Sequence, residues 1–410
     1  MKQAKTIIAW ICRTLLGAVF IFSGAVKAID PLGTVYKIED YLKAFGGFFT
    51  DLMPLAEVAA WGLIVLELLL GVCMLLNVRT QWTAWIALLF YCVMTPLTLY
   101  IALTNPVSDC GCFGDAVLLT NWQTFWKNVM LILLAIILIA LRKSVRELWQ
   151  SWVEGVIAIV TIVLALAFML WTNNHLPVKD FRPYKIGNHL PTLMEYPEDA
   201  EQDQYEITLV YEQNGVEQAF TIETYPKGDS TWTYVRTDTK LIKKGYEPPI
   251  HDLEIINAEG EDITWDVLES EEPVTLVVMY DLAKADKKQM DKVVRLLGDE
   301  AMRLEGDEAI GLEGDEAIGL EGEKAKGYIL TGSGTDEIIS FSLEYPSLSE
   351  CICTCDPVTL KTIVRANPGV IVVQNGVVID KYNVRNRECD WSLEDARRAS
   401  YSLEFKGKEY

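Results

Sequence analysis

Five long apolar runs fill the first 172 residues of this 410-residue chain and constrain its fold more than any other feature. A helix needs about 20 apolar residues to cross the hydrocarbon core of a bilayer. The tryptophans of this part lie mostly at the ends of the runs, where indole rings rest among lipid headgroups. The sequence therefore predicts five transmembrane helices, near residues 6–28, 57–77, 80–103, 126–141 and 152–172.

The basic residues of this part predict how the spans are oriented, because loops rich in Lys and Arg stay in the cytoplasm. They cluster at the N-terminus and in the second and fourth connections: Lys2, Lys5, Arg79, Arg142, Lys143 and Arg146. With five spans these places share one side of the membrane. We therefore predict a multi-pass protein of the cell inner membrane, with a cytoplasmic N-terminus and a periplasmic C-terminal domain. The first run is too long for a signal peptide and lacks a clear cleavage site, so we expect it to be retained.

After the fifth span the apolar runs shrink to strand length. Residues 205–224 alternate between apolar and polar around Asn214-Gly215, which predicts a β-hairpin. Further on, a strand and turn are expected at 252–260, strands at 275–280, 327–330, 370–374 and 377–381, and helices at 284–297 and 357–366. Alternating strands and helices favour an α/β sandwich. The predicted divisions are a membrane unit (1–148), a fifth span (149–173), a linker with a small β unit (174–250) and an α/β domain (251–410).

The net charge of −21 comes mainly from the C-terminal half. Such a domain repels phosphate backbones, so nucleic acid is not an expected partner. Part of the charge lies in an octapeptide repeat, GDEAMRLE and its copies, over residues 298–329. We interpret the repeat as an exposed extension, since the spacing of a calcium-binding loop is absent. The expected partners are membrane lipids and a periplasmic client protein.

The candidate catalytic residues are Cys110 and Cys112, in the turn-rich stretch 108–115. Two thiols one residue apart close only a small, strained ring, and strained exposed disulfides are easily reduced. A redox pair is therefore favoured over structural bridges from each cysteine to a partner elsewhere. A metal site is the third alternative, but the spacing of zinc ligands is not met, and no metal is predicted.

Four further cysteines lie on the predicted outer side: Cys351, Cys353, Cys355 and Cys389. The first three alternate, so on a strand they share one face. They are candidates for a thiol relay, for structural disulfides or for a soft-metal patch. Cys12, Cys73 and Cys92 fall inside spans and are expected to be apolar fillers.

Arg13 and Glu67 are charged residues within the first and second spans. Charges inside a membrane are costly and usually face a partner or a cavity. Arg13 is expected either to extend toward the headgroups or to pair with Glu67. The pair is interpreted as a polar lock between helices or as the lining of a quinone or proton site, and quinone is the one candidate cofactor.

Residues 5–145 resemble the DoxX/MauE family of small membrane proteins. The similarity lies in the stretch from Arg13 to Gly24 with Lys27, in the run after Glu67, and in the Asp-Cys-Gly-Cys-Phe-Gly-Asp loop at 109–115. This loop is the most specific feature and points to MauE. The resemblance implies a four-helix membrane unit linked to disulfide formation in an exported partner or to quinone-dependent sulfur oxidation.

The last 160 residues are similar to thioredoxin-like domains of the TlpA kind. The similarity lies in residues 257–280 and in Asn367-Pro368-Gly369, where Pro368 matches the family's cis-proline. The family has a Cys-x-x-Cys after the strand that ends near Tyr280, where this chain has 281–286 without a cysteine. The domain is therefore expected to be degenerate.

Two functions follow from these features. The first is a membrane protein of thiol–disulfide redox metabolism that supports disulfide formation or passes electrons from envelope proteins to a membrane quinone. The second is a non-enzymatic scaffold that anchors a binding domain in the cell envelope. The Cys-Gly-Cys loop favours the first, and the missing Cys-x-x-Cys favours the second.

Overall fold

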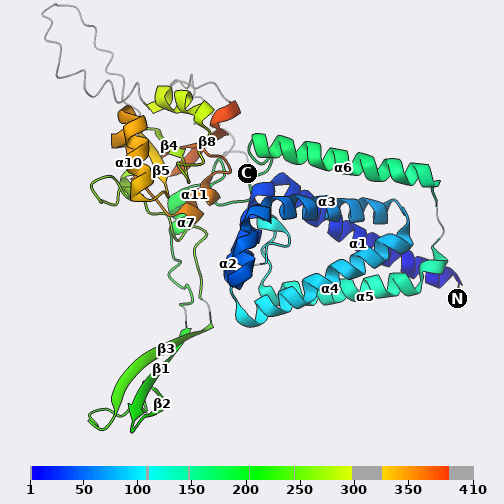
Figure 1. Cartoon of the computed structure of the whole chain (residues 1–410), viewed down its shortest axis with the longest axis horizontal. Helices are drawn as coiled ribbons and strands as arrows, with labels where there is room; N and C mark the ends of the chain where they lie inside the picture. Colours follow the sequence, from blue (N-terminus) through cyan, green and yellow to red (C-terminus); the bar gives the residue numbers. More distant parts are fainter. Residues whose placement is uncertain are drawn as a thin grey trace, which may run out of the picture.

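The computed structural model describes residues 2–107, 110–145, 148–202, 204–243, 245–297 and 326–386. Within these ranges the chain forms a helical bundle, a sheet-containing region beside one end of that bundle, and an arm of three strands (Figure 1). The N-terminus lies at the opposite end of the bundle. We call the two ends of the bundle the sheet side and the N-terminal side.

Five helices of the bundle are long and apolar enough to cross a membrane, which confirms the predicted number of spans. They are α1 (Lys2–Ile29), α3 (Ala56–Leu75), α4 (Thr80–Thr104), α5 (Asn121–Ala140) and α6 (Ser151–Asn174). The fourth membrane-spanning helix, α5, begins at Asn121, five residues before the start predicted at residue 126. Thr120 and Gln123 form a capping box there, which satisfies free backbone N–H groups at the start of the helix.

Close packing of α1 against α3 depends on glycines. A Cβ atom at Gly71 would lie 2.7 Å from the backbone nitrogen of Ile21, and one at Gly24 would lie 2.8 Å from Leu68. Small residues of this kind let membrane helices approach closely enough for dispersion forces to hold them together. The glycines therefore set both the distance and the register of this helix pair.

The bundle is a wedge that opens toward the sheet side. The α1–α3 pair and the α4–α5 pair approach each other near the N-terminal side and diverge at the other end (Figure 1). Helix α2 (Pro31–Phe45) lies across the open end, where the sequence predicted only a connecting loop. Its start has a clear local cause, because Asp30 accepts a hydrogen bond from the Gly33 amide and Pro31 occupies the first turn.

The sheet-containing region has a mixed five-stranded sheet with the order β6-β5-β4-β7-β8. Strands β4 (Val274–Val278), β5 (Lys326–Thr331) and β6 (Ile352–Thr354) are parallel, and β7 (Gly369–Gln374) and β8 (Val377–Asn383) form an antiparallel hairpin. β4 pairs with β7 in antiparallel fashion. The peptide bond between Asn367 and Pro368, just before β7, is cis.

Both faces of this sheet are buried, as expected for strands with nearly continuous apolar sequence. One face packs against α8 (Thr264–Leu268) and α11 (Pro357–Ile363), with Leu276 and Ile371 in its core. The other packs against α10 (Thr335–Glu344) and the helical residues 290–297. Asp356 caps α11 by accepting hydrogen bonds from the amides of residues 358 and 359.

Two predicted elements differ from the structure. Of the strand and turn expected over 252–260, the turn is present at 258–259 but the strand is not, and Ile256 makes only isolated bridges, to Asp262 and Thr354. The helix expected over 284–297 is regular only from 290, after the short turn η4 (Lys287–Gln289). The side chains of Asp281 and Asp286 accept hydrogen bonds from the nearby amides of Lys284 and Lys288, which favours turns in place of a longer helix.

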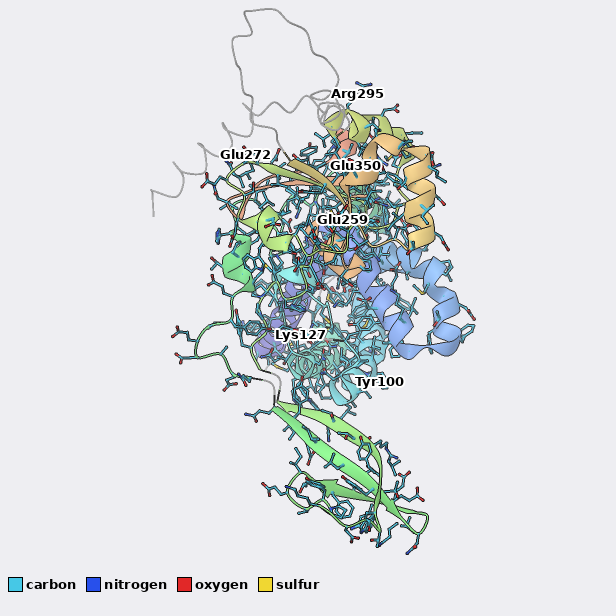
Figure 2. The ribbon with its side chains drawn as sticks, turned by 90° about the vertical axis from the view of Figure 1, so that its left-hand side faces the viewer. Tyr100, Lys127, Glu259, Glu272, Arg295 and Glu350 are labelled. Carbon is cyan, nitrogen blue, oxygen red and sulfur yellow. The ribbon has the colours of Figure 1, made fainter. Side chains whose placement is uncertain are left out.

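The arm is a three-stranded antiparallel sheet that projects away from the bundle and the larger sheet (Figures 1 and 2). It contains the predicted hairpin of β1 (Gln204–Gln213) and β2 (Val216–Thr221), and a third strand, β3 (Thr233–Lys243), which was not predicted. Asn214 and Gly215 both have positive φ, as a tight hairpin turn requires. Residues 298–325, which hold most of the octapeptide repeat, lie outside the described residues.

The glycine contact between α1 and α3 can be tested with Gly71→Ala. The added methyl group meets the Ile21 backbone, so α1 and α3 must separate, and we expect a lower melting temperature in detergent. Gly62→Ala in the same helix is the matched control, because its Cβ position has no neighbour within 4 Å. Equal melting temperatures for the two variants would contradict this account of the helix packing.

Candidate functional site

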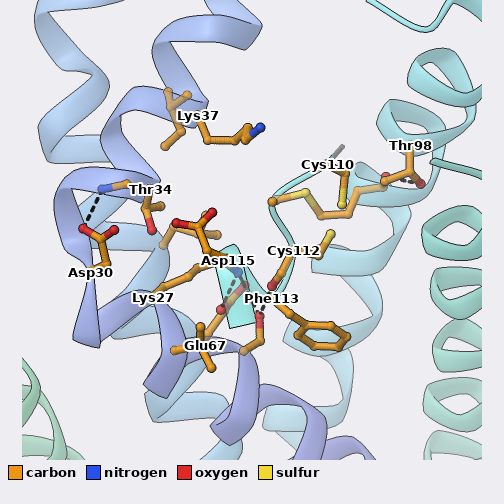
Figure 3. A pocket seen from close by; sticks show the side chains of 18 of the residues that line it. Lys27, Asp30, Thr34, Lys37, Glu67, Thr98, Cys110, Cys112, Phe113 and Asp115 are labelled. Atoms are coloured by element: carbon orange, nitrogen blue, oxygen red, sulfur yellow. Dashed lines mark hydrogen bonds and ion pairs between the residues drawn. The ribbon is translucent and has the colours of Figure 1, made fainter. Parts of the chain in front are cut away.

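A cavity of about 390 Å³ lies in the open end of the wedge. Its walls come from α1, α3, α4 and α5, and it is bordered on the sheet side by α2, the loop between α4 and α5, and Pro177 and residues 179–182 after α6. Several polar groups of separate helices point into it (Figure 3). The cavity brings together two of the predicted site elements, the Cys-Gly-Cys loop and Glu67.

An ion pair between Lys27 and Glu67 forms the polar floor of the cavity. The Lys27 ammonium donates hydrogen bonds to both carboxylate oxygens, at 2.7 and 2.8 Å, and both side chains are almost fully buried. It also donates to the Ser23 hydroxyl at 2.8 Å. All three ammonium hydrogens therefore have partners, which a buried charge requires.

The predicted pairing of Arg13 with Glu67 is wrong. Glu67 binds Lys27, and Arg13 is buried with two of its guanidinium nitrogens lacking a hydrogen-bond partner among the described residues. Lys27 belongs to the same face of α1 as Arg13, so helical periodicity did not distinguish the two bases. The two bases differ in their position along α1, and only Lys27 lies at the level of Glu67.

Hydrogen bonds to two backbone carbonyl groups hold the Cys-Gly-Cys loop in place. Ser23 donates a hydrogen bond to the Cys112 carbonyl at 2.8 Å, and Tyr41 of α2 donates to the Cys110 carbonyl at 2.6 Å. Gly111 has a positive φ of 62°, and a Cβ atom there would lie 2.8 Å from the Lys37 side chain. The middle residue of the loop must therefore be glycine for both conformational and steric reasons.

The side chains of Cys110 and Cys112 point toward each other (Figure 3), and both are free thiols. A hydrogen bond from the Cys112 side chain lowers the pKa of Cys110 to about 6, helped by the Thr124 hydroxyl at 3.5 Å and the Lys127 ammonium. The same hydrogen bond, together with burial, raises the pKa of Cys112 well above its usual value. The pair thus combines one thiolate and one thiol near neutral pH, as in reactive cysteine pairs.

The remaining cavity walls are mainly apolar and aromatic. Phe20, Phe90 and Tyr91 pack together with ring centroids 5.3 to 5.4 Å apart, and Lys127 lies 4.3 Å over the ring of Phe113. Asn128 donates a hydrogen bond to Thr98 at 3.2 Å, and both residues line the cavity. An apolar chamber with a few fixed polar groups is suited to a flat, mostly apolar molecule.

Among the described residues, the predicted cysteines Cys351, Cys353 and Cys355 are not part of the cavity lining. Cys353 and Cys355 are buried free thiols in the core of the sheet-containing region, and burial raises the pKa of each to about 12. Cys351 is half-buried, just before β6. Cys389 lies outside the described residues. The described residues contain no group of three or more His, Cys, Asp or Glu side chains placed to hold a metal ion.

The bundle and its cavity define a helical membrane unit with a paired-cysteine loop. Residues 5–141 match the family model of the methylamine utilisation protein MauE, so this part of the chain is similar to that membrane protein. Residues 205–244, the arm, match a domain of unknown function, DUF8463. Comparisons with curated proteins and with solved structures found no match.

The buried ion pair gives a prediction for stability. Lys27→Met leaves the Glu67 carboxylate buried without a partner and is expected to cost about 3–5 kcal/mol. The double variant Lys27→Met/Glu67→Met removes both charges and should regain most of this loss. Chemical denaturation in mixed micelles measures both, and a double variant no more stable than the single one would contradict the pairing.

The thiolate character of Cys110 gives a prediction for reactivity. Alkylation requires the thiolate, so the reaction of Cys110 with iodoacetamide should persist down to about pH 6 and fall below it. Thr124→Val removes a hydrogen bond to the thiolate and should move the midpoint of this profile to higher pH. Thr161→Val is the control, because the Thr161 hydroxyl bonds only to its own helix at Ile157. Mass spectrometry of the Cys110 peptide gives the rates, and identical midpoints would argue against this role of Thr124.

Proposed function

We propose that Cys110 and Cys112 form the redox centre of a membrane thiol–disulfide oxidoreductase that passes electrons from client dithiols to a membrane quinone. The observation that carries the proposal is the position of two neighbouring thiols, one with a pKa near 6, at the edge of a largely apolar cavity within the bundle. A quinone ring has the shape and polarity for such a cavity, and its hydrocarbon tail would extend into the lipid.

The two cysteines have distinct roles in the proposed reaction. A client thiolate attacks the Cys112 sulfur of the Cys110–Cys112 disulfide, because Cys112 is the more exposed of the two. Cys110 leaves as a thiolate, for which its lowered pKa is suited, since a thiol of low pKa is the better leaving group. A second client thiolate then displaces Cys112, which takes up a proton, and the client holds the new disulfide.

Reoxidation completes the cycle. In forming their disulfide the two cysteines lose two electrons and the one proton that Cys112 holds, and the quinone takes up both electrons, that proton and a second proton from water to become the quinol. The quinone is the only oxidant that this scheme requires. The Lys27–Glu67 pair fixes the loop next to the cavity through Ser23, which accepts from Lys27 and donates to the Cys112 carbonyl.

We also propose the orientation in which the sheet side faces the periplasm of the inner membrane. Arg79, Arg142 and Lys143 lie at the N-terminal side of the bundle, and loops rich in such residues stay in the cytoplasm. The redox pair and the sheet-containing region then share an oxidising compartment, where client disulfides persist.

The sheet-containing region is, in this proposal, a degenerate thioredoxin-like domain. Its strand order, its closing hairpin and its cis-proline at Pro368 support that interpretation. Residues 281–286, where such domains have a Cys-x-x-Cys, contain no cysteine. The domain would therefore bind a client or the membrane unit instead of exchanging disulfides. The missing motif also favours the second candidate function, a non-enzymatic scaffold of the cell envelope.

Thiol trapping distinguishes the two functions. Protein reduced and then washed in lipid nanodiscs receives a short-chain quinone, and we expect one quinol formed for each Cys110–Cys112 disulfide. Cys110→Ser should abolish quinol formation, whereas Cys92→Ser, which removes an exposed thiol of α4 outside the cavity lining, should leave it unchanged. If the redox state of the pair is the same with and without quinone, the scaffold is the better hypothesis.

A further inference from the structure

The region after α6 covers the cysteine cavity from the sheet side. Pro177 and residues 179–182 line the cavity itself. Helix α2 lies between the cysteine loop and the sheet-containing region, since Tyr41 binds the loop while Tyr36 contacts Tyr280 at a ring distance of 6.5 Å. Access to Cys112 from water therefore depends on how this covering region is attached.

Two polar attachments join this region to the bundle: Asn174, the last residue of α6, binds Asn383, Arg385 and Asn386 where the chain enters the region, and Arg365 binds at the cavity. Arg365, which follows α11, is buried and donates to the Asp30 carboxylate at 2.8 Å. A second nitrogen of its guanidinium lies 3.6 Å from the carboxylate of Asp115, the last residue of the Cys-Gly-Cys-Phe-Gly-Asp loop. Arg365 thus connects the sheet-containing region to both the start of α2 and the end of the cysteine loop.

Tyr36 completes this contact. Its ring lies 5.2 Å from the Arg365 guanidinium and 4.7 Å from the Lys361 ammonium, so two cations of the sheet-containing region stack on one ring of the membrane unit. The contacts that Arg365, Lys361 and Tyr36 make here are charged and aromatic. Interfaces of this composition resemble transient ones, whereas permanent interfaces are mostly apolar.

The cavity-lining segment is fastened to the sheet-containing region. Asp180 binds Arg182 through both carboxylate oxygens and also binds Lys381 of β8 at 2.6 Å. Arg182 donates to the Thr362 carbonyl at 3.0 Å. These groups are largely buried, so residues 180–182 move with the sheet when the sheet moves. Release of Arg365 would then uncover the cavity.

We propose that the sheet-containing region is a lid on the cysteine cavity, latched by Arg365 between Asp30 and Asp115, and that a protein client reaches Cys112 only when the latch is open. The closed lid shields the thiols from unspecific exchange with other proteins. The client's part in this inference rests on the proposed function. The existence of the lid does not rest on the proposed function, because the accessibility of Cys112 can be measured whether or not Cys112 takes part in catalysis.

The test is the rate at which a maleimide carrying a large polymer labels Cys112 in the reduced full-length protein in nanodiscs. Peptide mass spectrometry separates this label from that on other cysteines. Arg365→Gln and Asp30→Asn should each raise the rate at least about tenfold, because removing one partner of a buried ion pair strongly destabilises the closed state. Asparagine keeps the helix cap at position 30. The double variant should be no faster than the single ones if both act on one latch.

Two controls keep the result specific. Arg236→Gln breaks an ion pair within the arm and should leave the Cys112 rate at the wild-type value. Cys353 and Cys355 lie in the core of the sheet-containing region and should remain unlabelled while the lid opens as a folded unit. A Cys112 rate that stays at the wild-type value in both latch variants, or that rises only together with labelling of Cys353 and Cys355, would overturn the lid.

Discussion

The rest of the site depends on the ion pair between Lys27 and Glu67. Two charges removed from water are tolerated only when each finds hydrogen-bond partners in good geometry. Here the Lys27 ammonium donates one hydrogen bond to each Glu67 carboxylate oxygen and a third to the Ser23 hydroxyl. Ser23 in turn donates to the Cys112 carbonyl. The hydrogen bonds that the buried Lys27 ammonium requires therefore continue through Ser23 to the cysteine loop, and they fix the position of the loop at the cavity.

Helix packing makes this pairing possible. In the antiparallel register of α1 and α3, Gly24 meets Leu68 and Gly71 meets Ile21, so Glu67 lies next to the last turns of α1. Lys27 is there, and Arg13 is several turns away toward the N-terminal side. The same close approach of α1 and α3 leaves the α4–α5 pair to diverge, which creates the space that the cavity occupies.

The five spans and most strands were predictable because their signals are local: apolar length for spans, alternation and buried runs for strands. Helix α2 was missed although its sequence carries local signals for a helix: Asp30-Pro31 is a good helix start, and Val35, Ile38 and Leu42 follow at helical spacing and pack in one cluster. The partner of Glu67 was missed because periodicity assigns Arg13 and Lys27 to one face and gives no depth. Cys110 and Cys112 were identifiable from spacing, whereas Tyr41 and Thr124, which bind Cys110 from other helices, carried no signal in the chain.

The end of β4 connects the two parts of the chain. Tyr280 follows β4 and packs on Tyr36 of α2, and Asn367, beside Pro368, donates a hydrogen bond to the Asp281 carbonyl. In the proposed thioredoxin-like fold, this edge is the one that would carry the Cys-x-x-Cys and bind substrates. A pair of thiols here would stand next to α2, one helix away from Cys110 and Cys112. If the domain is thioredoxin-like, as we propose, the absence of a cysteine pair here and the contact with α2 have a common explanation: this edge binds the membrane unit of its own chain, and a lid needs no disulfide exchange at that contact.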